Sequence, residues 1–231
     1  MKKIKFIDTS EDFSEIYGPQ PSSKNLPGWY KNIAGYRDND KNSYKDGTTS
    51  ATIKKCIPVF DSLSAGYLIK TYCDIKIEWD DIMYTIQSPS MYNESVEYHP
   101  LWQAEGHPDV SSYHASVPKF MTRWAIKTPP GYSCLIIPPM HRENVIQILP
   151  GLIDTDSYGE LINFPFVISK HGFSGVIPAG TPIAQIIPIK RESWEMSSYK
   201  DSKSHIPYRS LVRSVFFDGY KNLFWSRKSY K

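Results

Sequence analysis

The stretch from Pro129 to Arg191 constrains the fold more than any other part of this chain of 231 residues. Short apolar runs alternate there with turns such as Pro129-Pro130-Gly131, in which proline presets φ and glycine supplies a positive φ. Apolar runs of strand length between such turns are typical of short antiparallel strands. The stretch therefore predicts a compact all-β barrel.

The same patterning extends over residues 51–192, which we expect to form the barrel. Its strands are expected at residues 66–77, 82–87, 122–128, 132–137, 145–149, 161–169 and 183–189. The first hairpin is expected to turn at residues 78–81. Residues 88–120 have little periodicity, so they are expected to form a long insertion, and loops of that length are usually functional or make contacts.

The two ends of the chain are expected to be extended arms. Residues 1–50 are interrupted by prolines and glycines, and such backbone often lies over a neighbouring surface. Residues 193–231 are basic and aromatic. Because aromatic residues are enriched at protein interfaces, we assign six of them to interfaces with other chains. These are Trp29, Tyr30, Phe216, Phe217, Phe224 and Trp225. Nucleic-acid binding by the same rings and cations is the alternative, which we do not favour.

The formal net charge of +3 is too small to indicate a nucleic-acid partner by itself. No apolar run is long enough to span a membrane, and no apolar segment follows the basic N-terminus, so neither membrane insertion nor secretion is expected. Three widely spaced cysteines argue against a disulfide framework and are expected to be buried reduced thiols. Lysines outnumber arginines by twenty to seven, a bias typical of AT-rich genomes such as those of many bacteriophages.

Residues 64–190 contain, in order, segments that resemble motifs of the dUTPase and dCTP-deaminase family. Ser64-Ala65-Gly66-Tyr67 is similar to the start of the first motif, and Gly180-Thr181-Pro182-Ile183-Ala184-Gln185 to the fourth. The best match is Gly151-Leu152-Ile153-Asp154-Thr155-Asp156, in the third motif. The resemblance implies a β-clip barrel that assembles as a homotrimer. The β-clip class also includes phage head decoration trimers, so the fold does not decide the function.

Most of the family's charged residues are replaced here. Leu68 stands where the first motif has its acidic residue, and Pro138-Pro139-Met140-His141-Arg142 lacks the serine of the second motif. Ser157 occupies the place of the tyrosine that rejects ribose, and Tyr158 follows it. The family's glycine-rich C-terminal motif is missing. Phosphoryl chemistry needs positioned cations and carboxylates, so this pattern favours a protein without catalytic activity.

Two hypotheses follow. The first is a non-catalytic, oligomeric structural or interaction protein, such as a decoration or connector component of a bacteriophage virion, made in the cytoplasm of the infected host and needing no cofactor. Its partners would be further copies of itself and other structural proteins. The second is a nucleotide-binding or nucleotide-hydrolysing enzyme with a diverged pocket, in which Mg²⁺ would accompany the nucleotide. Its site would use Arg142, Asp154, Tyr158 and Gln185, with Asp154 in the place of the family's catalytic aspartate.

A metal site is a third and weaker idea. His107 and Asp109 form a His-x-Asp pair, which is the first half of the iron site in 2-oxoglutarate oxygenases. Such a site needs a third, distal histidine, for which His141, His171 and His205 are candidates. Hydrogen-bonded loop histidines are the simpler interpretation of the same residues.

Overall fold

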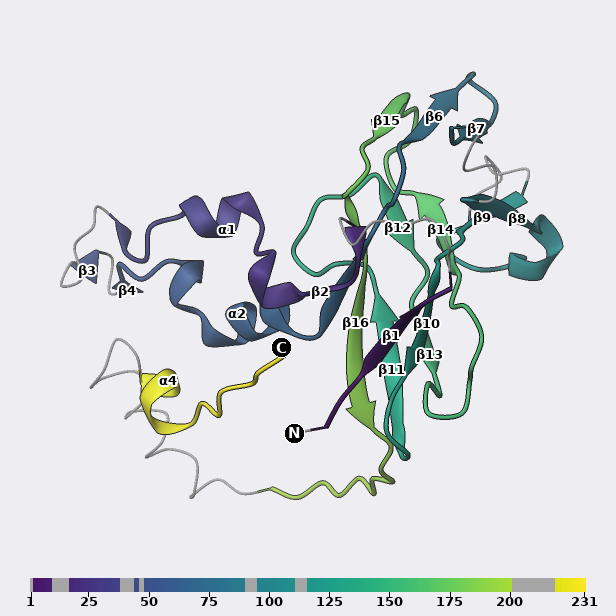
Figure 1. Cartoon of the computed structure of the whole chain (residues 1–231). Coiled ribbons are helices and arrows are strands. Elements are labelled where there is room, and N and C mark those ends of the chain that lie inside the picture. Colours follow the sequence, from purple (N-terminus) through teal and green to yellow (C-terminus); the bar gives the residue numbers. More distant parts are fainter. Residues whose placement is uncertain are drawn as a thin grey trace. The chain divides into compact units, whose positions relative to one another are not determined.

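The computed structural model describes residues 2–9, 17–37, 44–45, 48–89, 95–110, 116–200 and 219–231 (Figure 1). The chain divides into two compact units. The first consists of Met1–Pro21 and Gly66–Arg191, and the second of Ser22–Ala65 and Glu192–Lys231. Antiparallel strands dominate the first unit, which confirms the predicted all-β class.

The central sheet of the first unit has five strands in the order β13-β11-β16-β5-β2. They are β2 (Gln20–Pro21), β5 (Tyr67–Lys70), β11 (Tyr132–Ile137), β13 (Gly151–Ile153) and β16 (Pro182–Lys190). The strands β11 and β16 lie side by side over their whole paired length, from Tyr132 opposite Lys190 to Ile137 opposite Gln185 (Figure 1). The register of this pair fixes which side chains meet at each end of the sheet.

Three smaller sheets complete the first unit. One contains β8 (Val96–Pro100), β9 (Ser116–Phe120), β12 (Ile146–Ile148) and β14 (Phe164–Ile168). Another contains β6 (Ile75–Trp79), β7 (Tyr84–Gln87) and β15 (Gly175–Ile177), and a ribbon pairs β1 (Lys5–Asp8) with β10 (Trp124–Lys127). A short 3-10 helix, η6 (Leu101–Ala104), follows β8. Their inward aliphatic and aromatic side chains, such as those of Ile148 and Phe166, form one buried core.

The structure confirms one predicted turn and the strand after it, and moves other predicted limits. The strand predicted at 132–137 is β11, and Gly131 before it has a φ of 80° as the Pro-Pro-Gly turn requires. The expected strand 66–77 is wrong as a single element, because it is broken into β5 and β6. The first hairpin turns two residues later than predicted, with the Asp80 carboxylate accepting the backbone N–H groups of Ile82 and Met83 at 2.9 and 2.8 Å.

Strands of these sheets also lie in the regions expected to be an insertion and an N-terminal arm. Residues 88–120 contain β8 and β9, which pair from Val96 opposite Phe120 to Pro100 opposite Ser116. Residues 1–50 contain β1 and β2, which pair with β10 and β5. The N-terminal segment is therefore divided between the two units at Pro21, rather than forming one arm.

The second unit contains short helices and turns. They are η2 (Ser22–Lys24), α1 (Gly28–Asn32), η4 (Ile53–Lys55), α2 (Ile57–Ser64) and α4 (Gly219–Leu223), with the pair β3 (Tyr44–Lys45) and β4 (Thr48–Thr49). The Thr52 hydroxyl caps η4, and Pro58 stands in the first turn of α2, where its missing N–H costs nothing. Within the described residues, no helix has the length and apolarity needed to cross a membrane.

Candidate functional site

The third motif places Asp154 beside the first residues of β11. The strand β13, which precedes Asp154, runs antiparallel to β11 with Ile153 opposite Cys134. The Ser133 hydroxyl donates to Asp154 Oδ1 at 2.6 Å, and Arg191 Nη1 lies 3.2 Å from the same oxygen. The Asp154 side chain remains 61% exposed. It is therefore an accessible carboxylate with one oxygen already held by a hydroxyl and a guanidinium.

Asp156 is the more strongly bound of the two carboxylates. Its side chain is 10% exposed, and Arg191 contacts both of its oxygens, with Nη1 at 2.8 Å from Oδ1 and Nη2 on Oδ2. The backbone N–H of Gly131 also donates to Oδ2, at 2.8 Å. The Arg191 hydrogen bonds and the Gly131 N–H hold the pKa of Asp156 well below its usual range. Asp156 in turn raises the pKa of Arg191.

Thr155, between the two aspartates, points into the protein. Its buried hydroxyl lies 2.8 Å from the Thr128 hydroxyl and donates to Cys134 Sγ at 3.3 Å. The Asp154 carbonyl accepts the backbone N–H groups of Ser157 at 3.1 Å and Tyr158 at 2.9 Å. The motif therefore forms a turn that is fixed by buried hydroxyls on one side and by backbone bonds on the other.

Arg142 and Gln185 lie at the opposite end of β11. Gln185 is opposite Ile137, and its buried side chain accepts the Met140 N–H at 2.9 Å. Burial lowers the pKa of Arg142. Burial, and then the charge of Arg142, lower the pKa of Lys70, whose Nζ lies 3.1 Å from Gln20 Oε1. This end of the sheet thus gathers two neighbouring cations in a partly buried setting.

The four residues assigned to a nucleotide pocket therefore fall into two groups within one chain. Asp154 adjoins Ser133 and accepts the Tyr158 N–H, whereas Gln185 lies opposite Ile137 and Arg142 lies near Lys70. Strands rise about 3.3 Å per residue, so Ser133 and Ile137 lie roughly 13 Å apart along β11. The two groups are therefore anchored at different ends of the same strand.

The structure gives no support to a metal site at His107. The Asp109 backbone N–H donates to His107 Nδ1 at 3.2 Å, which occupies one ring nitrogen. Among the described residues, no group of three or more His, Cys, Asp or Glu side chains could hold a metal ion, and His205 lies outside them. Leu68, where the resembling first motif has an acidic residue, is a buried aliphatic side chain of β5.

The six residues predicted to lie at interfaces with other chains do not share one environment. Tyr30 is 5% exposed, stacks on Phe60 with ring centroids 6.4 Å apart and donates its hydroxyl to the Lys54 carbonyl, so it is a core residue of its own unit. Trp29 and Phe224 are exposed. Trp225 donates its indole N–H to the Asp61 carboxylate. The predicted interface residues Phe216 and Phe217 lie outside the described residues.

The start of the predicted C-terminal arm carries exposed apolar side chains that were not among the predicted interface residues. Residues 191–200 have no regular secondary structure, and every one of them is exposed. Trp194, Met196 and Tyr199 are 87%, 91% and 80% exposed. Trp194 and Met196 are two residues apart and Met196 and Tyr199 are three apart, so the three share no single helical or strand period. Three large apolar side chains this exposed within a short segment are unusual on a protein surface.

Comparisons with known proteins find a weak structural resemblance to phage dUTPases. One is a mutant dUTPase of Staphylococcus bacteriophage 80alpha with dUpNHpp, at 15% identity over 61% of this chain and 78% of that one, with a TM-score of 0.33. Another is a mutant dUTPase of phage phi11 of S. aureus, at 13% identity over 74% of this chain and 97% of that one, with a TM-score of 0.32. No protein-family model and no curated protein matches the sequence. Function is therefore inferred from this chain's own residues.

Proposed function

We propose that this chain is a non-catalytic, oligomeric structural or interaction protein, built on an all-β body and serving as a component of a bacteriophage particle. The observation that carries the proposal is the exposed segment 191–200 with Trp194, Met196 and Tyr199. An extended segment with large apolar side chains is suited to lie in a groove of another chain, where those side chains leave water.

The possible gain in stability is large enough to support assembly. Burying a large apolar side chain contributes about 1.5–3 kcal/mol, so the three together contribute roughly 4.5–9 kcal/mol before the cost of association. In a closed homo-oligomer every chain would contribute one such segment, so the contacts repeat by symmetry. A homotrimer is the oligomer that the family resemblance favours, and other structural proteins of the particle would be further partners.

The arrangement of the polar residues supports the non-catalytic part of the proposal. Asp154 shares Arg191 with Asp156, so the guanidinium nearest to it is already engaged by carboxylates. Arg142 and Gln185 lie at the far end of β11. The lysine-rich composition supports a phage origin, and the protein would then occur in the virion or in the cytoplasm of the infected host cell.

The test replaces Trp194, Met196 and Tyr199 with serine together and measures the mass of the full chain by native mass spectrometry. We expect the unmodified chain to be an oligomer and the triple variant to be a monomer with unchanged far-UV circular dichroism. A matched control replaces three exposed apolar residues of the first unit, Ile82, Trp102 and Leu152, with serine. A monomeric unmodified chain, or a triple variant that assembles normally, would contradict the proposal.

Nucleotide binding is the second candidate, because the Asp154 carboxylate is accessible and Arg142 and Lys70 form a neighbouring pair of cations. One nucleotide serving both groups would have to span the length of β11 between Ser133 and Ile137. Deoxyuridine triphosphate at millimolar concentration should then raise the melting temperature, since a ligand stabilises the state that it binds. Asp154→Asn should remove the effect. The absence of any shift in the unmodified protein would eliminate this candidate.

A further inference from the structure

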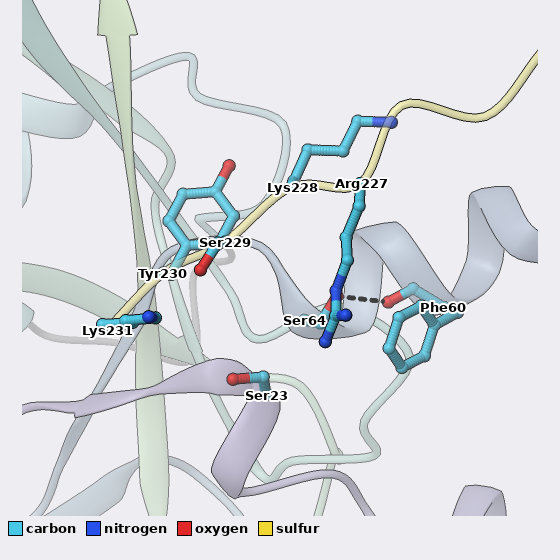
Figure 2. A pocket seen from close by; sticks show the side chains of 8 residues that line it. All are labelled: Ser23, Phe60, Ser64, Arg227, Lys228, Ser229, Tyr230 and Lys231. Atoms are coloured by element: carbon cyan, nitrogen blue, oxygen red, sulfur yellow. Dashed lines mark hydrogen bonds between the residues drawn. The ribbon is translucent and has the colours of Figure 1, made fainter. Parts of the chain in front are cut away.

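The second unit contains a cavity of about 420 Å³ between helical segments and the end of the chain (Figure 2). Its walls come from η2, α2 and residues 227–231. The lining residues are Ser23, Phe60, Ser64, Arg227, Lys228, Ser229, Tyr230 and Lys231. The volume falls within the range of roughly 300–1,000 Å³ that is usual for small-molecule sites.

Asp61 of α2 fixes the wall formed by the end of the chain. The Trp225 indole N–H donates to both carboxylate oxygens, at 3.1 and 3.0 Å, and Lys228 Nζ lies 2.7 Å from Oδ2. The Asp61 side chain is only 18% exposed, so these charge-assisted bonds are largely shielded from water. The wall is therefore held in place without the help of Arg227 or of any ligand.

The charged side chains that line the cavity are those of Arg227, Lys228 and Lys231, all of them cationic. Lys228 is balanced by Asp61, which also raises the pKa of Lys228 and keeps it charged. In the part of the chain that the structure describes, the Arg227 guanidinium has no carboxylate partner. Figure 2 shows the Arg227 side chain extending from residues 227–231 toward Ser64 of α2. Among the described residues, Arg227 therefore gives the cavity a positive charge that no side-chain carboxylate pairs, which favours an anionic occupant.

The remaining lining groups suit an anion attached to an organic body. Hydroxyl groups of Ser23 and Ser229 can donate to an anion's oxygens, and burial raises the pKa of Tyr230. The Ser64 hydroxyl is already bonded to the Phe60 carbonyl at 2.7 Å, as the dashed line in Figure 2 shows. The rings of Phe60 and Tyr230 lie on opposite sides of Arg227 in this view.

We propose that this cavity binds a phosphorylated small molecule, with its phosphoryl oxygens on the Arg227 guanidinium and its organic part between Phe60 and Tyr230. A planar guanidinium matches phosphate oxygens with two parallel hydrogen bonds. The cations surround one cavity and do not follow a groove, so a small ligand fits better than a nucleic-acid strand. The site belongs to the second unit and does not depend on the function proposed above.

Isothermal titration of the full chain with pyrophosphate, at constant ionic strength, tests the proposal. We expect saturable binding that Arg227→Gln weakens roughly tenfold or more, since charge-assisted bonds to the anion are lost. The matched control is Lys221→Gln, which removes the same charge from α4 outside the cavity and should bind like the unmodified chain. Circular dichroism of both variants verifies that they are folded.

A second measurement uses no variant. Adding pyrophosphate to the unmodified protein should shift the NMR signals of the Phe60 ring and the Ser64 amide. No saturable binding, no shift at these two residues, or equal weakening by both variants would overturn the proposal. Displacement of pyrophosphate by single-stranded DNA would also overturn the proposal if Lys221→Gln weakens binding of that DNA. Such a result would favour a diffuse nucleic-acid surface.

Discussion

Arg191 and Asp156 both form hydrogen bonds with Gly131 in the turn before β11. The Arg191 backbone N–H donates to the Gly131 carbonyl at 2.9 Å, and the Gly131 N–H donates to the Asp156 carboxylate at 2.8 Å. The Arg191 guanidinium also pairs with that carboxylate, so Gly131, Asp156 and Arg191 each contact the other two. The end of β16, the turn before β11 and the third motif are therefore held together by one charged pair.

The first prediction is that Asp156 makes stability depend on pH. The pKa of Asp156 is depressed in the folded protein. Its contribution to the free energy of unfolding is therefore fully present above the unfolded-state pKa of about 3.9. That contribution is lost as pH falls from there toward the folded-state pKa. Asp156→Asn should lower the melting temperature at pH 7. Below about pH 4, the melting temperature of the variant should fall less than that of the unmodified protein. Thermal unfolding followed by circular dichroism between pH 2 and pH 7 measures this. Glu160→Gln, at an exposed carboxylate, should leave the pH profile unchanged.

Gly66→Ala should strongly destabilise the first unit. Gly66 has a φ of 63°, and a Cβ there would lie 1.9 Å from the Ile186 carbonyl oxygen and 2.8 Å from its carbon. These are backbone atoms of β16 that cannot move away alone, so we expect a loss of about 3 kcal/mol or more. Gly28→Ala is the control, because a Cβ at Gly28 meets nothing within 4 Å. Chemical denaturation should show a loss below about 1 kcal/mol for it. Equal losses for both variants would refute the steric argument.

Local signals in the sequence predicted the parts of the fold that depend on neighbouring residues. The Pro-Pro-Gly turn and β11 were predicted because φ preferences and alternating burial act within a few residues. The strand β2 has only two residues and exists because β5 lies beside it, which no local pattern reveals. The Asp156–Arg191 pair joins residues 35 apart and was missed for the same reason. Asp154 was found only through the resemblance of its motif.

Trp225→Phe should release the C-terminal segment from α2. The substitution keeps an aromatic ring but removes the indole N–H that donates to Asp61 at 3.0 and 3.1 Å. Hydrogen bonds to a charged group are worth about 1.5–3 kcal/mol, so local opening should become easier by that amount. Limited trypsin digestion should then cleave at Arg227 and Lys228 faster, with the first unit intact. Phe224→Leu, at an exposed ring, should not change the cleavage rate.

The three cysteines should differ sharply in reactivity. The expectation that all are buried is wrong for Cys56, which is exposed at the start of α2, whereas Cys73 and Cys134 are buried. Burial raises the pKa of the Cys73 and Cys134 thiols, so both lack access and thiolate character. Ellman's reagent should therefore modify one thiol quickly in the native protein and all three in denaturant. Cys56→Ser should abolish the fast phase. A second fast thiol in the native protein would show that the first unit opens locally at Cys73 or Cys134.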